Sequence, residues 1–257
     1  MNTRHIARKR FSQNFLINEF VIEQIIEIIN PQKEDFLIEI GPGLAALTMP
    51  LLNYIQKLRV VEIDRDIINY LKEKFDVNKI EIFSADALKF DFTFNNEKIR
   101  VVGNLPYNIS TPLLFHLMKF NNILDMHFML QKEVVSRICA KPNSHEYGKL
   151  TVMLQYKYNC EKMLDVGKEC FKPQPKVESA IVKIMPKPNA DWEGVDIVKL
   201  EKVVGLAFQQ RRKTINNSLK QLFDKKKLND LGIDENKRAE NLTINEYKIL
   251  AKAIGKN

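Results

Sequence analysis

Short apolar runs alternate with helical patterns over the first half of the chain, and this alternation limits the possible folds. The runs occupy residues 36–40, 58–63, 80–83, 99–102 and 126–130. Strand and helix alternating five times predict an α/β domain with a mostly parallel sheet covered on both faces. Ligands of such sheets bind beyond the carboxyl ends of the strands. We therefore expect a site in the loops that follow these runs.

The second half of the chain predicts a different architecture. Residues 150–158 and 177–185 have strand-like patterns and predict a late antiparallel pair, and Met185-Pro186-Lys187-Pro188 is typical of a linker. Beyond it, apolar residues recur at helical spacing among many charges: Leu200, Val203, Val204, Ala207, Ile215, Leu219 and Leu222. A chain of 257 residues has room for a large domain at residues 1–187 and a small helical domain at 188–257.

Charge and residue usage narrow the function classes. The 40 Lys and Arg residues against 32 Asp and Glu give a net charge of +8, which favours a polyanionic partner, either a nucleic acid or an anionic membrane. No stretch approaches 18 consecutive apolar residues, and the basic N-terminus lacks a signal-peptide core, so we expect no membrane span and a cytoplasmic location. The 3 Cys and 4 His residues show no metal-ligand spacing, so neither a metal nor a disulfide is expected.

A basic arm begins the chain. Residues 4–10 read R-H-I-A-R-K-R, and the aromatic residues Phe11 and Phe15 follow closely. A solvated tail would explain the charges, but a purely disordered arm is poor in aromatic residues, so we expect residues 1–16 to pack on something. Asn18 is then placed to cap a helix that ends at Asn30-Pro31.

Residues 101–112, V-V-G-N-L-P-Y-N-I-S-T-P, predict a strand end, a stiff loop and a helix start. The Asn104 side-chain oxygen and the backbone carbonyl beside Pro106 are two fixed acceptors that could hold and polarise the weakly nucleophilic amino group of adenine. Tyr107 offers a face on which a base could stack. A structural turn with a buried tyrosine explains the tetrapeptide Asn104-Leu105-Pro106-Tyr107 equally well.

A nucleotide site is indicated by E-I-G-P-G-L-A-A, which places G-x-G-x-x-A directly after a strand, with Glu62 21 positions after Gly41. This spacing fits a dinucleotide and S-adenosylmethionine equally. Pro42 removes one backbone donor from the loop, which favours the cofactor without a pyrophosphate. Asp86, after the third strand, could accept a hydrogen bond from the cofactor's adenine or could cap a helix.

Runs along most of the chain carry a family resemblance. They are R-K-R-F-S-Q-N-F-L, E-I-G-P-G-L-A-A-L-T, V-V-E-I-D-R-D, G-N-L-P-Y-N-I-S-T-P-L, H-F-M-L-Q-K-E-V, Y-G-K-L-T-V, F-K-P-Q-P-K-V-E-S-A and F-Q-Q-R-R-K-T-I. Together they resemble the ribosomal RNA adenine N6-dimethyltransferase family, most closely its bacterial small-subunit branch, in which loss of the enzyme gives kasugamycin resistance. The resemblance implies a Rossmann-like S-adenosylmethionine-dependent methyltransferase domain followed by a small helical domain.

The resemblance also implies an activity. A monomer would dimethylate N6 of two adjacent adenosines near the 3′ end of small-subunit (16S) rRNA within a pre-30S particle. The implied cofactor-binding residues are Asn14, Leu16, Gly41, Glu62, Asp86 and Asn104. The implied catalytic residues are Asn104, Leu105, Pro106, Tyr107 and, as a second aromatic wall, Phe171. The candidate RNA contacts are Arg8, Lys9, Arg10, Arg211, Arg212 and Lys213.

Three alternatives stay open at this point. A ribosome assembly factor that acts by binding would use the same basic surface. A large-subunit adenine methyltransferase would share the nucleotide motifs, although H-F-M-L-Q-K-E-V and Q-Q-R-R-K-T resemble the small-subunit branch. A nicotinamide-dependent dehydrogenase would leave residues 104–107 without a role.

Overall fold

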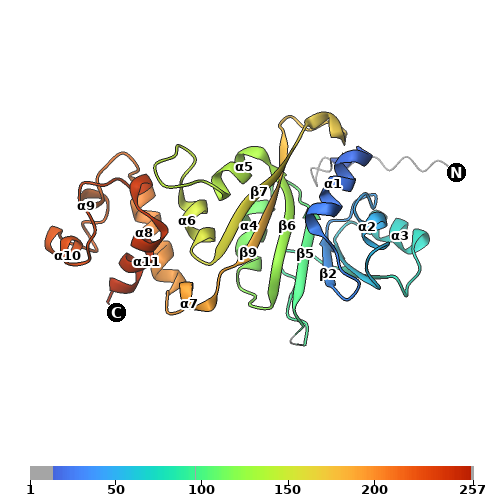
Figure 1. Cartoon of the computed structure of the whole chain (residues 1–257), viewed down its shortest axis with the longest axis horizontal. Coiled ribbons are helices and arrows are strands. Elements are labelled where there is room, and N and C mark those ends of the chain that lie inside the picture. The colour runs from blue at the N-terminus through green and yellow to red at the C-terminus, as the bar shows by residue number, and fades with distance from the viewer. Residues whose placement is uncertain (1–13, 96, 256–257) are drawn as a thin grey trace. The chain divides into compact units, whose positions relative to one another are not determined.

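The computed structural model describes residues 14–95 and 97–255, and the chain divides into two compact units (Figure 1). The first unit contains the described residues through Val135 together with residues 161–185. The second contains residues 136–160 and the described residues from Pro186 onward. The second unit therefore includes residues 136–160, which the sequence pattern had placed in the first domain, in addition to the helical C-terminal part.

A seven-stranded sheet is the framework of the first unit (Figure 1). Its order is β4-β3-β2-β5-β6-β9-β7; the neighbours from β4 to β6 are parallel, and β9 is antiparallel to β6. The strands are β2 (Phe36–Ile40), β3 (Leu58–Glu62), β4 (Ile80–Ser84), β5 (Ile99–Asn104), β6 (Ile123–Gln131), β7 (Tyr158–Val166) and β9 (Ser179–Pro186). The five parallel strands coincide with the five apolar runs, which confirms the predicted α/β fold. The order reverses between β2 and β5, where such folds open a crevice.

A second, two-stranded sheet joins segments that are distant in sequence. Strand β1 (Phe15–Leu16) pairs antiparallel with β8 (Phe171–Lys172), and the Ile17 amide donates to the Cys170 carbonyl at 2.8 Å. This pairing holds the segment before the first helix against the loop that leads into β9.

The helices of the first unit begin and end where the sequence provides caps. Helix α1 (Glu19–Ile29) starts at Asn18, whose side chain accepts from the Val21 amide at 3.1 Å, and ends at Asn30 in the left-handed conformation. The other helices that begin in this unit are α2 (Thr48–Leu51), α3 (Arg65–Lys74), α4 (Ser110–Leu117) and α5 (Lys132–Ile138). Apolar side chains of α1 and α3 share one buried cluster with residues of β2 and β3.

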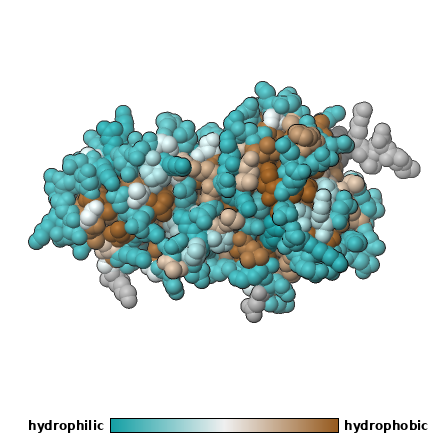
Figure 2. Space-filling view, viewed as in Figure 1, coloured by the Kyte–Doolittle hydropathy of each residue, from teal (hydrophilic) through white to brown (hydrophobic). Residues whose placement is uncertain are grey.

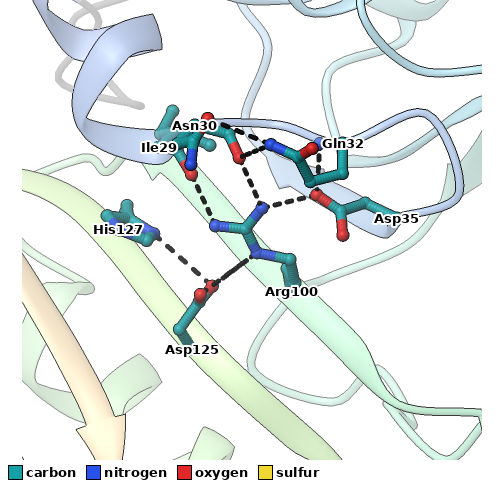
Figure 3. Close-up of polar contacts among 7 residues, drawn as sticks. All are labelled: Ile29, Asn30, Gln32, Asp35, Arg100, Asp125 and His127. Atoms are coloured by element: carbon teal, nitrogen blue, oxygen red, sulfur yellow. Dashed lines mark hydrogen bonds and ion pairs between the residues drawn. The ribbon is translucent and has the colours of Figure 1, made fainter.

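Arg100, near the start of β5, is the centre of a polar network that joins four segments (Figure 3). Its guanidinium forms ion pairs with Asp35 and Asp125 and donates to the Ile29 and Asn30 carbonyls at the end of α1. The Arg100 side chain is only 11% exposed, and those of Asp35 and Asp125 are 17% and 16% exposed. One partly buried cation thus pairs with two carboxylates and caps the end of a helix.

The second unit is built from α6 (Lys149–Gln155), α7 (Asn189–Trp192), α8 (Ile197–Gln209), α9 (Ile215–Ser218), α10 (Lys225–Asp230) and α11 (Ile244–Ala253). Buried tyrosines tie its segments together: the Tyr147 hydroxyl donates to the Leu242 carbonyl at 2.9 Å, and the Tyr247 hydroxyl to the Ala239 carbonyl at 2.7 Å. The strand predicted over residues 150–158 is wrong, because residues 150–155 belong to α6 and β7 begins only at Tyr158. Residues 150–154 are all buried, so the run lacks the polar face that distinguishes a helix from a buried strand.

No helix in the described part of the chain combines the length and the apolar character needed to cross a bilayer.

Candidate active site

A cavity of about 330 Å³ lies at the carboxyl edge of the parallel strands. Its walls come from the segments that follow β2, β3, β4 and β5 and from the segment that contains β1. The predicted site residues that line it are Asn14, Leu16, Gly41, Glu62, Asp86, Asn104, Leu105, Pro106 and Tyr107. The fold thus brings together all the predicted cofactor residues and the whole Asn104–Tyr107 tetrapeptide, which are spread over 94 positions of the chain.

The glycine loop after β2 brings backbone close to the end of β5. Gly41 has φ of 67°, in the left-handed region that glycine adopts without strain, and its amide donates to the Val61 carbonyl at 3.0 Å. A Cβ at position 41 would lie 3.9 Å from the Asn104 carbonyl oxygen. Because residue 41 has no side chain, the backbone of the loop itself lies close to the backbone of Asn104.

Two carboxylates, one at the end of β3 and one just after β4, each leave one oxygen available. Glu62 is 8% exposed; its Oε1 accepts from the Ile63 and Asp64 amides at 2.7 and 2.8 Å, and its other oxygen has no partner among the described residues. Burial raises the pKa of Glu62, and the two amide bonds partly offset that rise. Asp86 Oδ1 accepts from the Leu88 amide at 2.9 Å, so it caps a local turn while its second oxygen stays available. These oxygens can accept hydrogen bonds from hydroxyl or amino groups of a ligand.

The side-chain amide of Asn104 has a fixed orientation. Its Nδ2 donates to the Asn14 carbonyl at 3.1 Å, and because that partner can only accept, the opposite atom is the carbonyl oxygen Oδ1. Oδ1 accepts from no described residue, and neither does the Leu105 carbonyl that precedes Pro106. The Leu105 amide donates to the Met129 carbonyl at 3.2 Å, which fixes the loop to β6. Two acceptors without partners therefore lie in the cavity-lining loop.

Tyr107 is held from two sides. Its hydroxyl lies 2.7 Å from Ser179 Oγ, on the first residue of β9, and its carbonyl accepts from Ser110 Oγ at 3.1 Å. Burial raises the pKa of the Tyr107 hydroxyl, so it is neutral at physiological pH. Sequence analysis did not identify Ser179 as part of the site, although the run F-K-P-Q-P-K-V-E-S-A contains it. The contact joins residues 72 positions apart.

Glu39 is a second residue that the sequence analysis missed. It lines the cavity, is 1% exposed, and accepts from Thr48 Oγ1 at 2.7 Å. Burial raises its pKa to about 7; the Thr48 bond opposes this rise, and the nearby Glu62 charge adds to it. A single acidic residue in the apolar run F-L-I-E-I was the available signal, since a charged residue in a strand buried on both faces is rare.

Glu39 makes the stability of the ligand-free protein depend on pH. Between pH 4.5 and about 7 the folded protein keeps a proton on Glu39 that the unfolded chain has lost, so the free energy of unfolding falls as pH rises through this window. Glu39→Gln keeps an acceptor for Thr48 and removes this dependence. We expect the free energy of unfolding of the variant, relative to that of the wild type, to rise by up to about 3 kcal/mol from pH 5 to pH 8. Urea unfolding at each pH measures this change.

The difference between variant and wild type at each pH cancels the contribution of the titrating groups that do not interact with Glu39. Asp66→Asn, at a position on the first turn of α3 outside the cavity, is a matched control for the replacement of one carboxylate by an amide. An equal stability difference for Glu39→Gln at pH 5 and pH 8 would show that Glu39 titrates normally.

The other predicted site residues are not among the described residues that line the cavity. Phe171 is 4% exposed and packs in the buried cluster with Leu16, its partner in the β1–β8 pair, and it is not among the residues that line the cavity. Arg211, Arg212 and Lys213 belong to the second unit. Arg8, Lys9 and Arg10 lie outside the described residues.

Sequence comparison gives the family. Residues 4–256 match the model of the family described as ribosomal RNA adenine dimethylase. A protein of Chromobacterium violaceum named ribosomal RNA small subunit methyltransferase A is 52% identical over 97% of this chain and 96% of its own. A protein of the same name from Legionella pneumophila (strain Corby) is 51% identical over 98% of this chain and 99% of its own.

Solved structures agree over nearly the whole chain. A dimethyladenosine transferase from Plasmodium falciparum superposes with a TM-score of 0.80 at 28% identity, covering 92% of this chain and 95% of that one. The 23S rRNA methyltransferase ErmE superposes with a TM-score of 0.75 at 25% identity, covering 94% and 99%. The chain therefore belongs to the ribosomal RNA adenine dimethylase family and is an S-adenosylmethionine-dependent methyltransferase.

Proposed function

We propose that this protein transfers methyl groups from S-adenosylmethionine to N6 of two adjacent adenosines near the 3′ end of 16S rRNA, within a pre-30S particle. The observation that carries the proposal is the orientation of Asn104, whose Oδ1 has no partner in the described structure. The next residue, Leu105, adds a second carbonyl that accepts from no described residue. We also propose that the protein acts as a monomer in the cytoplasm, where ribosomal subunits are assembled.

The cavity residues fit the cofactor. S-adenosylmethionine supplies a methyl group on a positively charged sulfur. The available oxygen of Glu62 suits ribose hydroxyls, and that of Asp86 suits the adenine amine, since both can accept hydrogen bonds. Gly41 has no side chain to occupy the space that the methionine portion needs, and Asn14 and Leu16 also line the cavity.

The loop of residues 104–107 would hold the target amine. Asn104 Oδ1 and the Leu105 carbonyl can accept the two N–H groups of an adenine N6, which orients the nitrogen lone pair and raises its electron density. Pro106 fixes the direction of the Leu105 carbonyl because the ring locks its own φ. Tyr107 would stack on the flat base, a contact worth about 1–3 kcal/mol.

Ser179 is expected to position the Tyr107 ring. Ser179→Ala removes the partner of the Tyr107 hydroxyl, and we expect kcat/KM for the RNA to fall about fivefold to tenfold, as for one lost hydrogen bond in a buried site. Tyr107→Phe should give a similar loss. The double variant should lose no more than either single variant, because both remove the same contact.

Ser218→Ala is a matched control, since Ser218 is also buried but belongs to the second unit. It should leave kcat/KM unchanged. If the losses of Ser179→Ala and Tyr107→Phe were simply additive, the two hydroxyls would not act as one unit, and the positioning role of Ser179 would be wrong.

Methylation of isolated subunits tests the proposed substrate. Small and large subunits lacking adenine methylation are incubated separately with the protein and S-adenosylmethionine carrying a labelled methyl group. We expect label in small subunits only, consistent with relatives near 50% identity named for the small subunit and a 23S enzyme at 25%. Label in large subunits alone would show that the substrate is the large subunit and not the small one. Binding of small subunits without any transfer would favour the assembly-factor hypothesis.

A further inference from the structure

The glycine loop after β2 is in contact with the segment that contains β1. A Cβ added at Gly43 would lie 3.1 and 3.2 Å from Cδ1 and Cε1 of Phe15, nearer than the separation of about 3.5–4.0 Å at which carbon atoms pack best. The Phe15 ring therefore lies against the backbone of Gly43, in the space that a side chain at position 43 would need. Both residues line the cavity, and the sequence analysis did not predict Phe15 as a site residue.

The two residues of β1 contact different parts of the first unit. Successive side chains of a strand point to opposite faces. Leu16 is 5% exposed and packs in the buried cluster, whereas the Phe15 ring lies on the glycine loop. The pairing with β8 covers only these two residues, and a short two-stranded pairing is marginally stable by itself. The two side chains therefore contribute to fixing the position of the segment.

The backbone carbonyl that precedes Phe15 orients Asn104. Nδ2 of Asn104 donates to the Asn14 carbonyl at 3.1 Å, and this bond leaves Oδ1 as the available atom of the amide. If the carbonyl moved, the amide could turn over and present Nδ2 in the place of Oδ1. A donor in that place would repel the N–H groups of an adenine amine, because it cannot accept from them. The orientation of Asn104 thus depends on where the segment lies.

We infer that Phe15 is a positioning residue for methyl transfer: its ring, packed on Gly43, fixes the Asn14 carbonyl and thereby orients the side-chain amide of Asn104. The inference rests on the proposed function, in which Oδ1 accepts from the target amine. Phe15 does not need to contact the RNA for this role. One chain of contacts then joins the glycine loop, proposed for the cofactor, to the loop proposed for the target base.

A double-variant cycle with Asn104 tests this role in the full chain. We expect Phe15→Ala to lower kcat about fivefold to tenfold at saturating S-adenosylmethionine and saturating small subunits, the usual effect of one hydrogen bond. In the Asn104→Ala protein the same substitution should lower kcat by less than about twofold, since the group through which Phe15 acts is absent. Equal losses in the two backgrounds would overturn the inference, because they would show an effect that does not pass through Asn104.

Phe20→Ala provides a matched control. The surface over α1 and the strands beside it is partly apolar (Figure 2). Phe20, on the first turn of α1, is 67% exposed and is not among the described residues that line the cavity. We expect Phe20→Ala to keep the wild-type kcat, and Phe15→Leu, which retains an apolar contact, to lose less than Phe15→Ala. A loss for Phe20→Ala as large as that for Phe15→Ala would also overturn the inference.

The side-chain amide of Asn104 gives a readout that needs no RNA. Its nitrogen–proton correlation signals in the NMR spectrum are assigned by their absence in Asn104→Ala. We expect these signals to move in Phe15→Ala toward the shifts of exposed side-chain amides, and to stay in place in Phe20→Ala. Unchanged signals in Phe15→Ala would refute the positioning role. If the wild type failed to methylate small subunits, the proposed function would fail, and the amide signals would still decide whether Phe15 orients Asn104.

Discussion

Asn104→Ala should reduce kcat for methyl transfer by about 10²–10³-fold, the usual cost of removing one oriented hydrogen-bonding group from a reacting centre. The structure gives the reason, because Nδ2 is anchored on the Asn14 carbonyl and Oδ1 is left available in the cavity wall. Alanine removes both the anchor and the acceptor. Initial rates at saturating S-adenosylmethionine and saturating small subunits measure the loss.

Two comparisons make this result specific. Asn53→Ala, at an exposed position outside the cavity, should keep the wild-type rate. Thermal unfolding of Asn104→Ala should stay close to that of the wild type, which separates lost chemistry from lost structure. An Asn104→Ala protein with near-normal turnover would refute the acceptor model of the 104–107 loop.

Arg100→Met should lower the free energy of unfolding by about 3–5 kcal/mol, a large part of the 5–15 kcal/mol typical of a folded domain. The substitution leaves Asp35 without its cation and Asp125 with only the His127 contact at 3.5 Å, and the Ile29 and Asn30 carbonyls at the end of α1 lose their Arg100 donors (Figure 3). A buried charge that loses its partner is far more costly than a surface charge, because the surrounding protein screens it poorly. Urea unfolding at neutral pH measures the change.

Lys57→Met provides the matched control. Lys57 pairs with Glu81 at 3.1 Å, but both side chains are about 40% exposed, so we expect a loss below about 1 kcal/mol. Adding Asp35→Asn and Asp125→Asn to Arg100→Met should recover part of the lost stability by removing the unpaired charges. Equal losses for Arg100→Met and Lys57→Met would show that the Arg100 network contributes no more than a surface ion pair.

The sequence predicted the framework well where local pattern determines structure. Each of the five parallel strands is a short apolar run bounded by turn residues, and α1 has caps at both ends. The cavity could be predicted because its residues directly follow strands that end at the same edge of the sheet. Local pattern also predicted a strand where α6 lies, because the buried residues of α6 show no polar face.

Contacts between distant segments could not be predicted from pattern. The Tyr107–Ser179 contact and the Arg100 network depend on how strands are ordered, which no local periodicity reveals. Phe171 resembled an aromatic wall of the site, yet its pairing with Leu16 places the ring in the core. The sequence predicted Arg211 as an RNA contact, but it could not predict the ion pair with Glu240, 29 positions away.

The most direct test of the central claim is to identify the methylated nucleosides by mass spectrometry after complete digestion of 16S rRNA treated with the protein and S-adenosylmethionine. We predict N6,N6-dimethyladenosine as the end product with wild-type protein and almost none with Asn104→Ala. A methyl group on a ribose oxygen or a ring carbon, or equal dimethyladenosine from both proteins, would contradict the proposed role of the 104–107 loop.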